Sequence, residues 1–157
     1  MAISNRILII EDDDDARKLI RVTLENGVRI IVESATVEEG MDLIDSLRFD
    51  IMLIDIGLSS GATNGLAIAK QVLAHPMQRL CQVAIVTGSD APEHIALAQE
   101  LGVAAYLIKP FSPGKLSAIV AKMESRLTDT LIVPPTRQPD APNTFGELRM
   151  TWPTLFF

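Results

Sequence analysis

Charged side chains follow three short apolar runs in this chain of 157 residues. The first run leads into Glu11 and Asp12, the second into Asp55 and the third into Lys109. Short apolar runs of this kind are typical of strands that are buried on both faces. Because the carboxyl ends of parallel strands share one edge of a sheet, we expect these four side chains to converge.

Three clustered carboxylates repel one another, and the repulsion raises their pKa values unless a cation neutralises it. Oxygen ligands suit a hard divalent ion such as Mg²⁺, and a nearby lysine suits a phosphoryl group. The residue types therefore point to phosphoryl chemistry. The competing interpretation is a solvated helix start, where carboxylates cap free N–H groups. At least one acid in the run 13–15 is expected to do only that.

The composition favours one folded domain in a reducing compartment. The chain is 48% hydrophobic, which argues against general disorder. A net charge of −6 and a pI near 4.8 disfavour a nucleic-acid or anionic membrane surface. Cys81 is the only cysteine, so no intramolecular disulfide can form. The first apolar run is too short for a signal segment or a membrane span. We therefore expect a soluble cytoplasmic protein that binds neither nucleic acid nor membrane.

Apolar runs alternate with helical patterns, which favours right-handed βαβ units and a parallel sheet. Strands are predicted at about 6–10, 29–33, 51–54, 82–86 and 104–108. Helices are predicted from about 14 to a stop at Gly27, and at about 36–47, 65–74, 92–101 and 112–127. In the first of these helices, the apolar residues Ala16, Leu19, Ile20 and Leu24 are expected on one face. Five strand–helix units predict an α/β fold, a doubly wound domain of three layers. After residue 130, prolines crowd the chain and exclude a regular helix.

The ordered motifs resemble the receiver domain of bacterial two-component response regulators. The matching residues are Ile-Leu-Ile-Ile-Glu-Asp-Asp at 7–13, then Asp55, then Thr87-Gly88, and then Tyr106 with Lys109-Pro110-Phe111. The resemblance covers about residues 5 to 127. It implies a flavodoxin-like or CheY-like (βα)5 fold with a five-stranded parallel sheet of order 2-1-3-4-5. A receiver domain is expected at 1–129, with a C-terminal extension rich in proline and aromatic residues at 130–157.

The resemblance also assigns roles to the acidic residues. Asp55 resembles the phosphoacceptor, a carboxylate nucleophile that forms an aspartyl phosphate. Glu11 and Asp12 resemble the acid pair that holds Mg²⁺, with Asp55 and the backbone carbonyl of Gly57 as the other protein ligands. Catalysis of phosphoryl transfer would then depend mostly on positioning and charge neutralisation.

Further roles follow for the residues on the last two strands. Lys109 resembles the cation that pairs with the phosphoryl group, and Thr87 the hydroxyl that binds a phosphate oxygen. Tyr106 resembles a switch aromatic that turns inward when Thr87 moves; the plain alternative is a strand tyrosine with its hydroxyl in water. The pair Lys109-Pro110 also invites a cis peptide bond.

The function implied by the resemblance is that of a stand-alone response regulator in two-component, or phosphorelay, signal transduction. The phosphodonor would be a histidine kinase or a histidine phosphotransfer protein. The output would be a protein–protein contact with a downstream target, and a homodimer is a further possible partner. The chain would catalyse its own phosphorylation and dephosphorylation rather than turn over a substrate. An alternative is a receiver-like interaction module whose phosphorylation is incidental.

Two other function classes fit less well. A haloacid-dehalogenase-type phosphatase needs a second acid two residues after its nucleophile, where this chain has Gly57. A flavodoxin-like mononucleotide binder needs a hydroxyl- and glycine-rich loop after the first strand, where the acidic run 11–15 would repel phosphate. His75 and His94 have no spaced partner for a metal and are expected at the surface.

The chain also departs from the receiver pattern. The loop after Asp55 has Leu58-Ser59-Ser60 in place of the usual proline, and Gly65 lies about two residues further on than expected. The tail holds four of the seven aromatic residues, namely Phe145, Trp152, Phe156 and Phe157. It is either a floppy extension or a segment that docks on the receiver or on a second copy, and we favour docking because exposed aromatics are costly.

Overall fold

The computed structural model describes residues 5–58, 64–132 and 155–156, and its centre is a parallel sheet. The strand order is β2-β1-β3-β4-β5-β6, and every neighbouring pair is parallel. The order of the first five strands confirms the predicted sheet, and β6 is an addition. The strands are β1 (Arg6–Ile10), β2 (Ile30–Ser34), β3 (Ile51–Ile54), β4 (Gln82–Thr87), β5 (Ala105–Ile108) and β6 (Leu155–Phe156).

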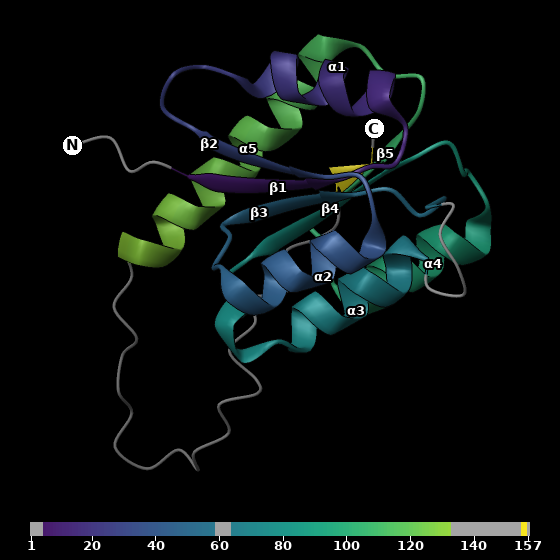
Figure 1. Cartoon of the computed structure of the whole chain (residues 1–157). Coiled ribbons are helices and arrows are strands. Elements are labelled where there is room, and N and C mark those ends of the chain that lie inside the picture. Colours follow the sequence, from purple (N-terminus) through teal and green to yellow (C-terminus); the bar gives the residue numbers. More distant parts are fainter. Residues whose placement is uncertain (1–4, 59–63, 133–154, 157) are drawn as a thin grey trace.

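Helices cover both faces of the sheet, so the domain has three layers. Figure 1 shows α1 and α5 on one face and α2, α3 and α4 on the other. The helices are α1 (Asp14–Leu24), α2 (Val37–Ser46), α3 (Gly65–Ala74), α4 (Pro92–Leu101) and α5 (Pro113–Ile132), and a short 3-10 helix η1 (Pro76–Gln78) follows α3. The division of the chain at residue 129 stays a prediction, and α5 extends past it.

The side chains of β1 pack into both hydrophobic cores, one on each face of the sheet. Successive side chains of a strand point to opposite faces. Leu8 and Ile10 pack in the cluster under α2 and α3, while Ile7 and Ile9 pack in the cluster under α1 and α5. All four are fully buried, and burial of one such side chain contributes roughly 1.5–3 kcal/mol. The apolar run therefore fixes the strand in the middle of the sheet.

Side chains cap the starts of α1, α2 and α3. Asp13 accepts a hydrogen bond from the N–H of Ala16, Thr36 from that of Glu39, and Asn64 from that of Ala67. These bonds satisfy N–H groups that have no partner within the helix. The interpretation of the acidic run as partly a helix cap is correct for Asp13.

Two local expectations for the first helix were wrong. α1 ends at Leu24, and Gly27 lies beyond it in the following loop with a φ of 76°. Leu19 was expected on the buried face of the helix but is 45% exposed. The core on this side is supplied instead by Ile20 and Leu24, which lie four residues apart and so share one face of the helix.

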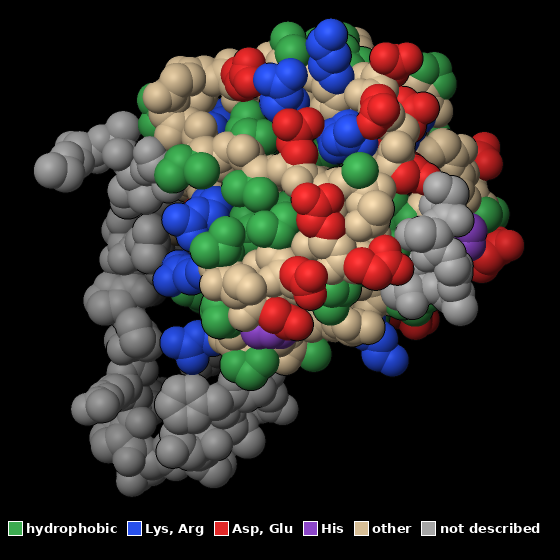
Figure 2. Space-filling model, viewed as in Figure 1, with side chains coloured by type: hydrophobic (Ala, Val, Ile, Leu, Met, Phe, Trp, Pro, Cys, Tyr) green, Lys and Arg blue, Asp and Glu red, His purple; other side chains and the backbone are tan. Residues whose placement is uncertain are grey.

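The surface carries charges of both signs. On the face shown in Figure 2, acidic side chains lie between basic ones, and no basic stripe crosses that face. The formal net charge is −6. Among the described residues, none of the helices is both long enough and apolar enough to span a membrane.

A two-pronged ion pair ties the start of β2 to α5. Arg29 Nε lies 2.7 Å from Glu124 Oε1, and Arg29 Nη2 lies 2.9 Å from Glu124 Oε2. The third guanidinium nitrogen, Nη1, donates to the backbone carbonyl of Leu24. The hydrogen bond from Arg29 lowers the pKa of Glu124, and the same bond raises the pKa of Arg29. The pair joins the sheet edge to the final helix.

We predict that Glu124→Gln lowers the free energy of unfolding by about 1–2 kcal/mol at pH 7. Because folding lowers the pKa of Glu124, its contribution is present above the unfolded carboxyl pKa of about 4.3 and is lost as the pH falls through the folded value. The gap between wild type and variant should therefore close below about pH 4. Urea unfolding at several pH values measures it, with exposed Glu100→Gln as the matched control.

Candidate functional site

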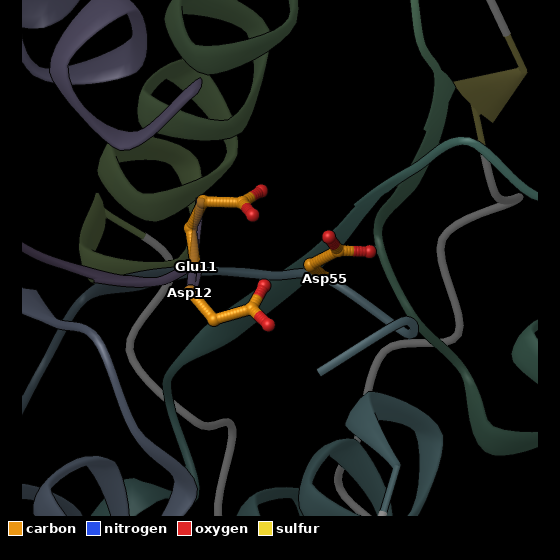
Figure 3. A group of neighbouring side chains, drawn as sticks. All are labelled: Glu11, Asp12 and Asp55. Atoms are coloured by element: carbon orange, nitrogen blue, oxygen red, sulfur yellow. The ribbon is translucent and has the colours of Figure 1, made fainter. Parts of the chain in front are cut away.

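The backbone brings the ends of β1 and β3 together. Ile10 is paired with Ile54 in the register of the two strands, so the next residues, Glu11 and Asp55, leave the sheet side by side. The N–H of Asp55 donates to the carbonyl of Ile10 at 3.1 Å. Figure 3 shows Glu11 and Asp12 extending from the end of β1 toward the side on which Asp55 lies. The sheet itself therefore places the acids.

The three acids form one cluster at this edge. One carboxylate oxygen from each of Glu11, Asp12 and Asp55 lies within 4.8 Å of the others. Oxygens around an octahedral ion with bonds of about 2.1 Å are about 3–4.2 Å apart. Small side-chain movements would bring the cluster to that spacing, and carboxylates are ligands that Mg²⁺ prefers. The donor set thus fits a magnesium ion.

Lys109 lies between two of these carboxylates. Its Nζ is 2.6 Å from Glu11 Oε2 and 3.1 Å from Asp55 Oδ2. Burial raises the pKa of Glu11, and the hydrogen bond from Lys109 opposes that rise. For Lys109, burial lowers the pKa, but the hydrogen bonds to Glu11 and Asp55 outweigh burial and the pKa is raised. The lysine is therefore a charged ammonium at neutral pH.

The carboxylate of Asp55 is held from two directions. Its Oδ1 accepts a hydrogen bond from the N–H of Gly57 at 3.0 Å, while Oδ2 faces Lys109. Asp55 is 8% exposed and Glu11 is 1% exposed. Desolvation strengthens charge interactions here, because the local dielectric constant is lower than that of water.

Gly65 packs against the backbone of Asp55. A Cβ atom built on Gly65 would lie 2.0 Å from the carbonyl oxygen of Asp55 and 2.9 Å from Cα of Ile56. The N–H of Gly65 also donates to the carbonyl of Ile56. The first residue of α3 thus supports the loop that carries the carboxylate. Of the departures noted from the sequence, Ser59 and Ser60 lie outside the described residues.

A second group of polar residues lies at the ends of β4 and β5. Thr87 is 2% exposed, and its Oγ1 accepts a hydrogen bond from the N–H of Ser89. The backbone N–H of Lys109 donates to the carbonyl of Thr87 at 2.8 Å. The Lys109–Pro110 peptide bond is cis, as predicted from the residue pair.

Tyr106 points into the protein. Its ring is 1% exposed, and its hydroxyl donates to the backbone carbonyl of Ser89 at 2.8 Å. Burial raises the pKa of the Tyr106 hydroxyl. The alternative of a hydroxyl in water does not hold in this structure.

Two contacts near the site were missed from the sequence. Ser89 Oγ lies 2.7 Å from His94 Nδ1, so the loop after β4 is joined to the first turn of α4. Arg17 Nη1 donates to the carbonyl of Glu11 at 2.8 Å and braces the first acidic residue. The periodicity of the sequence cannot predict such contacts, because each depends on the path of a loop relative to a helix. His94, which was expected at the surface, is half-buried.

Comparison with known proteins decides the family. The family model of the response regulator receiver domain matches residues 7–121. That range contains both polar groups described above. This chain belongs to the response regulator receiver family. The receiver domain predicted from the ordered motifs is thereby confirmed.

Individual relatives agree with this result. The receiver is 31% identical to the probable C4-dicarboxylate response regulator DctR of Halalkalibacterium halodurans over 121 residues, which are 76% of this chain and 51% of the relative. It is 28% identical to the nisin biosynthesis regulatory protein NisR of Lactococcus lactis subsp. lactis over 92% of this chain and 57% of the relative. The chain spans about half the length of the curated relatives that it matches.

Solved structures share the fold. A CheY-like receiver domain protein from Methanospirillum hungatei JF-1 has a TM-score of 0.69 and 26% identity, and the match covers 82% of this chain and 97% of that chain. The BeF3 activated DrrB receiver domain has a TM-score of 0.70 and 22% identity, with 78% of this chain and 99% of that chain covered. The CheY-like flavodoxin fold is therefore confirmed.

We predict that Gly65→Ala lowers the free energy of unfolding by about 1–3 kcal/mol, because the added methyl group forces the Asp55 backbone away. Chemical denaturation measures the loss, and amide chemical shifts of residues 55–57 should report the local displacement. Gly114→Ala is the matched control, since Gly114 is exposed in α5 and a Cβ there has room. A Gly65→Ala protein as stable as the Gly114→Ala protein would contradict the packing argument.

Proposed function

We propose that this receiver accepts a phosphoryl group on Asp55 from a histidine kinase or a histidine phosphotransfer protein. The observation that carries the proposal is the position of the Asp55 carboxylate, which lies in an acidic cluster and 3.1 Å from the ammonium of Lys109. A carboxylate at this place can act as a nucleophile, and the lysine can neutralise charge on the incoming group.

The proposed ligands for Mg²⁺ are the carboxylates of Glu11, Asp12 and Asp55, with the backbone carbonyl of Gly57. The clustering of the three acids supports this set. A bound Mg²⁺ ion would neutralise the cluster and the phosphoryl oxygens, which together carry too much negative charge to lie side by side. Burial raises the pKa of Glu11, so a second positive charge beside that of Lys109 would help to keep this carboxylate ionised.

In the transfer step, an oxygen of Asp55 attacks the phosphorus atom of phosphohistidine. The new bond joins that oxygen to phosphorus, and the phosphorus–nitrogen bond to the donor imidazole breaks. Lys109 already contacts Asp55 Oδ2, so a short movement of its ammonium would pair it with a phosphoryl oxygen. The receiver thus catalyses its own modification by positioning and charge. Hydrolysis of the aspartyl phosphate by water would release inorganic phosphate and restore the Asp55 carboxylate.

Thr87 and Tyr106 are the proposed switch. The hydroxyl of Thr87 accepts a hydrogen bond from the N–H of Ser89 in this structure, and its own hydrogen remains able to donate to a phosphoryl oxygen. Movement of Thr87 toward that oxygen would break its bond to Ser89, the residue whose carbonyl holds Tyr106. The buried tyrosine would then respond to the state of Asp55.

The proposed output is a protein–protein contact through α4, β5 and α5. Receiver domains of this family interact with histidine kinases and downstream targets, and for this chain those partners are part of the proposal, as is a homodimer. A cytoplasmic location belongs to the same proposal. It is supported by the composition, since the single cysteine, Cys81, cannot form an intramolecular disulfide.

We predict that acetyl phosphate with Mg²⁺ phosphorylates the wild-type chain and that Asp55→Asn takes up no phosphate, because the amide is not a nucleophile. Intact-mass spectrometry measures the uptake. Asp15→Asn is the matched control, since Asp15 is exposed in the first turn of α1. Beryllofluoride, which activates the DrrB receiver domain, should alter the amide spectrum of the wild type and of Asp15→Asn only. Equal labelling of Asp55→Asn and wild type would refute the proposal.

We predict that Asp12→Asn weakens Mg²⁺ binding by at least about tenfold, since loss of even an outer-shell partner of a metal costs about 10–100-fold. Isothermal titration calorimetry measures the affinity, again with Asp15→Asn as the control. Unchanged Mg²⁺ affinity in Asp12→Asn would remove this residue from the ligand set.

A further inference from the structure

Leu155 and Phe156 form a strand on the outer edge of the sheet. β6 runs parallel to β5, with Leu155 opposite Ala105 and Phe156 opposite Tyr106. Figure 1 shows this short strand beside β5 at the C-terminus. The strand order places β6 last, next to β5 alone. Without β6, β5 would be the edge of the described sheet.

An edge strand presents unpaired N–H and C=O groups that can bind another extended segment. Partners use such edges by adding a strand, in which backbone hydrogen bonds supply affinity and alternate side chains supply specificity. The edge of β5 is continuous with the surface through which we propose the output contact. A segment that occupies this edge therefore occupies part of that surface.

The sequence of the tail supports the same contact independently. The chain ends in Leu155, Phe156 and Phe157, which come after Pro153 and Thr154. Phenylalanine is enriched in strands. The segment between Ile132 and Leu155 has a sequence of 22 residues at 133–154. Such a segment reaches at most about 75 Å, which is ample for a return to the β5 of the same molecule.

We propose that the outer edge of β5 is a strand-addition site and that its resident occupant is the chain's own segment Leu155–Phe156. A protein that adds a strand of its own to the outer edge of β5 must first displace this segment. The contact is short, with only two residues in the strand, so displacement requires the loss of few hydrogen bonds. The competition with a partner rests on the proposed function, whereas the strand addition does not.

The strand also touches the residue through which the site would communicate. Phe156 lies opposite Tyr106 in the register, and the Tyr106 hydroxyl is bonded to Ser89. Lys109 follows the end of the same strand, β5. The tail therefore contacts the strand that carries both Tyr106 and, at its end, the lysine of the acidic site.

The first test is amide hydrogen exchange on the full chain. In the variant Leu155→Pro/Phe156→Pro, both positions lose the N–H group and β6 cannot pair. Among the amides of residues 105–107, those that face away from β4 should exchange at least about tenfold faster, while amides of β1 and β3 keep their rates. The control Asn143→Pro/Thr144→Pro adds two prolines elsewhere in the tail. Unchanged exchange in the Leu155→Pro/Phe156→Pro variant would overturn the proposal.

The second test supplies the strand from outside. A fluorescent peptide with the sequence of residues 147–157 should bind the Leu155→Pro/Phe156→Pro chain at least about tenfold more tightly than wild type, whose edge is occupied. A peptide with the same two prolines should not bind. Equal binding of the peptide to both chains would refute the strand-addition site. If wild type forms dimers and the Leu155→Pro/Phe156→Pro variant does not, the strand comes from a second copy and the proposed occupant is refuted. Both tests use unphosphorylated protein, so their outcome does not depend on Asp55 as phosphoacceptor.

Discussion

The ion pairs of Lys109 with Glu11 and Asp55 are the interactions on which the site depends. Glu11 is almost fully buried, and a buried carboxylate is costly unless a cation or hydrogen-bond donors accompany it. The ammonium supplies that charge from another strand, and the N–H of Asp13 supplies a hydrogen bond to the same carboxylate. The carboxylates of Glu11 and Asp55 can therefore stay close together before any metal or phosphoryl group arrives.

The sheet makes this arrangement possible because its strands are held from both faces. Apolar side chains of β1 and β3 pack in two separate clusters, so neither strand can slide or tilt without opening a core. Gly65 adds a contact at the level of the backbone, where the first residue of α3 lies against Asp55. The positions of the carboxylates are thus fixed mainly by apolar packing away from the site. The polar residues of the loops add the remaining contacts.

Much of this could be predicted from the sequence. The apolar runs that end at Glu11, Asp55 and Lys109 predict a parallel sheet. They also predict the edge at which the polar side chains meet, because the ends of parallel strands share one edge. The contact of Ser89 with His94 could not be found in this way, since it depends on the path of a loop. Nor could β6, because two residues that pair across a long sequence separation leave no periodic signal. Leu19 had the right spacing for a core position, but Ile20 and Leu24 fill that space.

Ser89 has contacts in three directions: its N–H meets Thr87, its carbonyl meets Tyr106 and its hydroxyl meets His94. A small movement of Thr87 would therefore alter contacts of the buried Tyr106 ring and of His94 in α4. No relay of intermediate side chains has to be maintained between them. In the proposed switch, a change at Thr87 would reach Tyr106 and α4 through one residue, by the amide hydrogen, the carbonyl oxygen and the hydroxyl of Ser89.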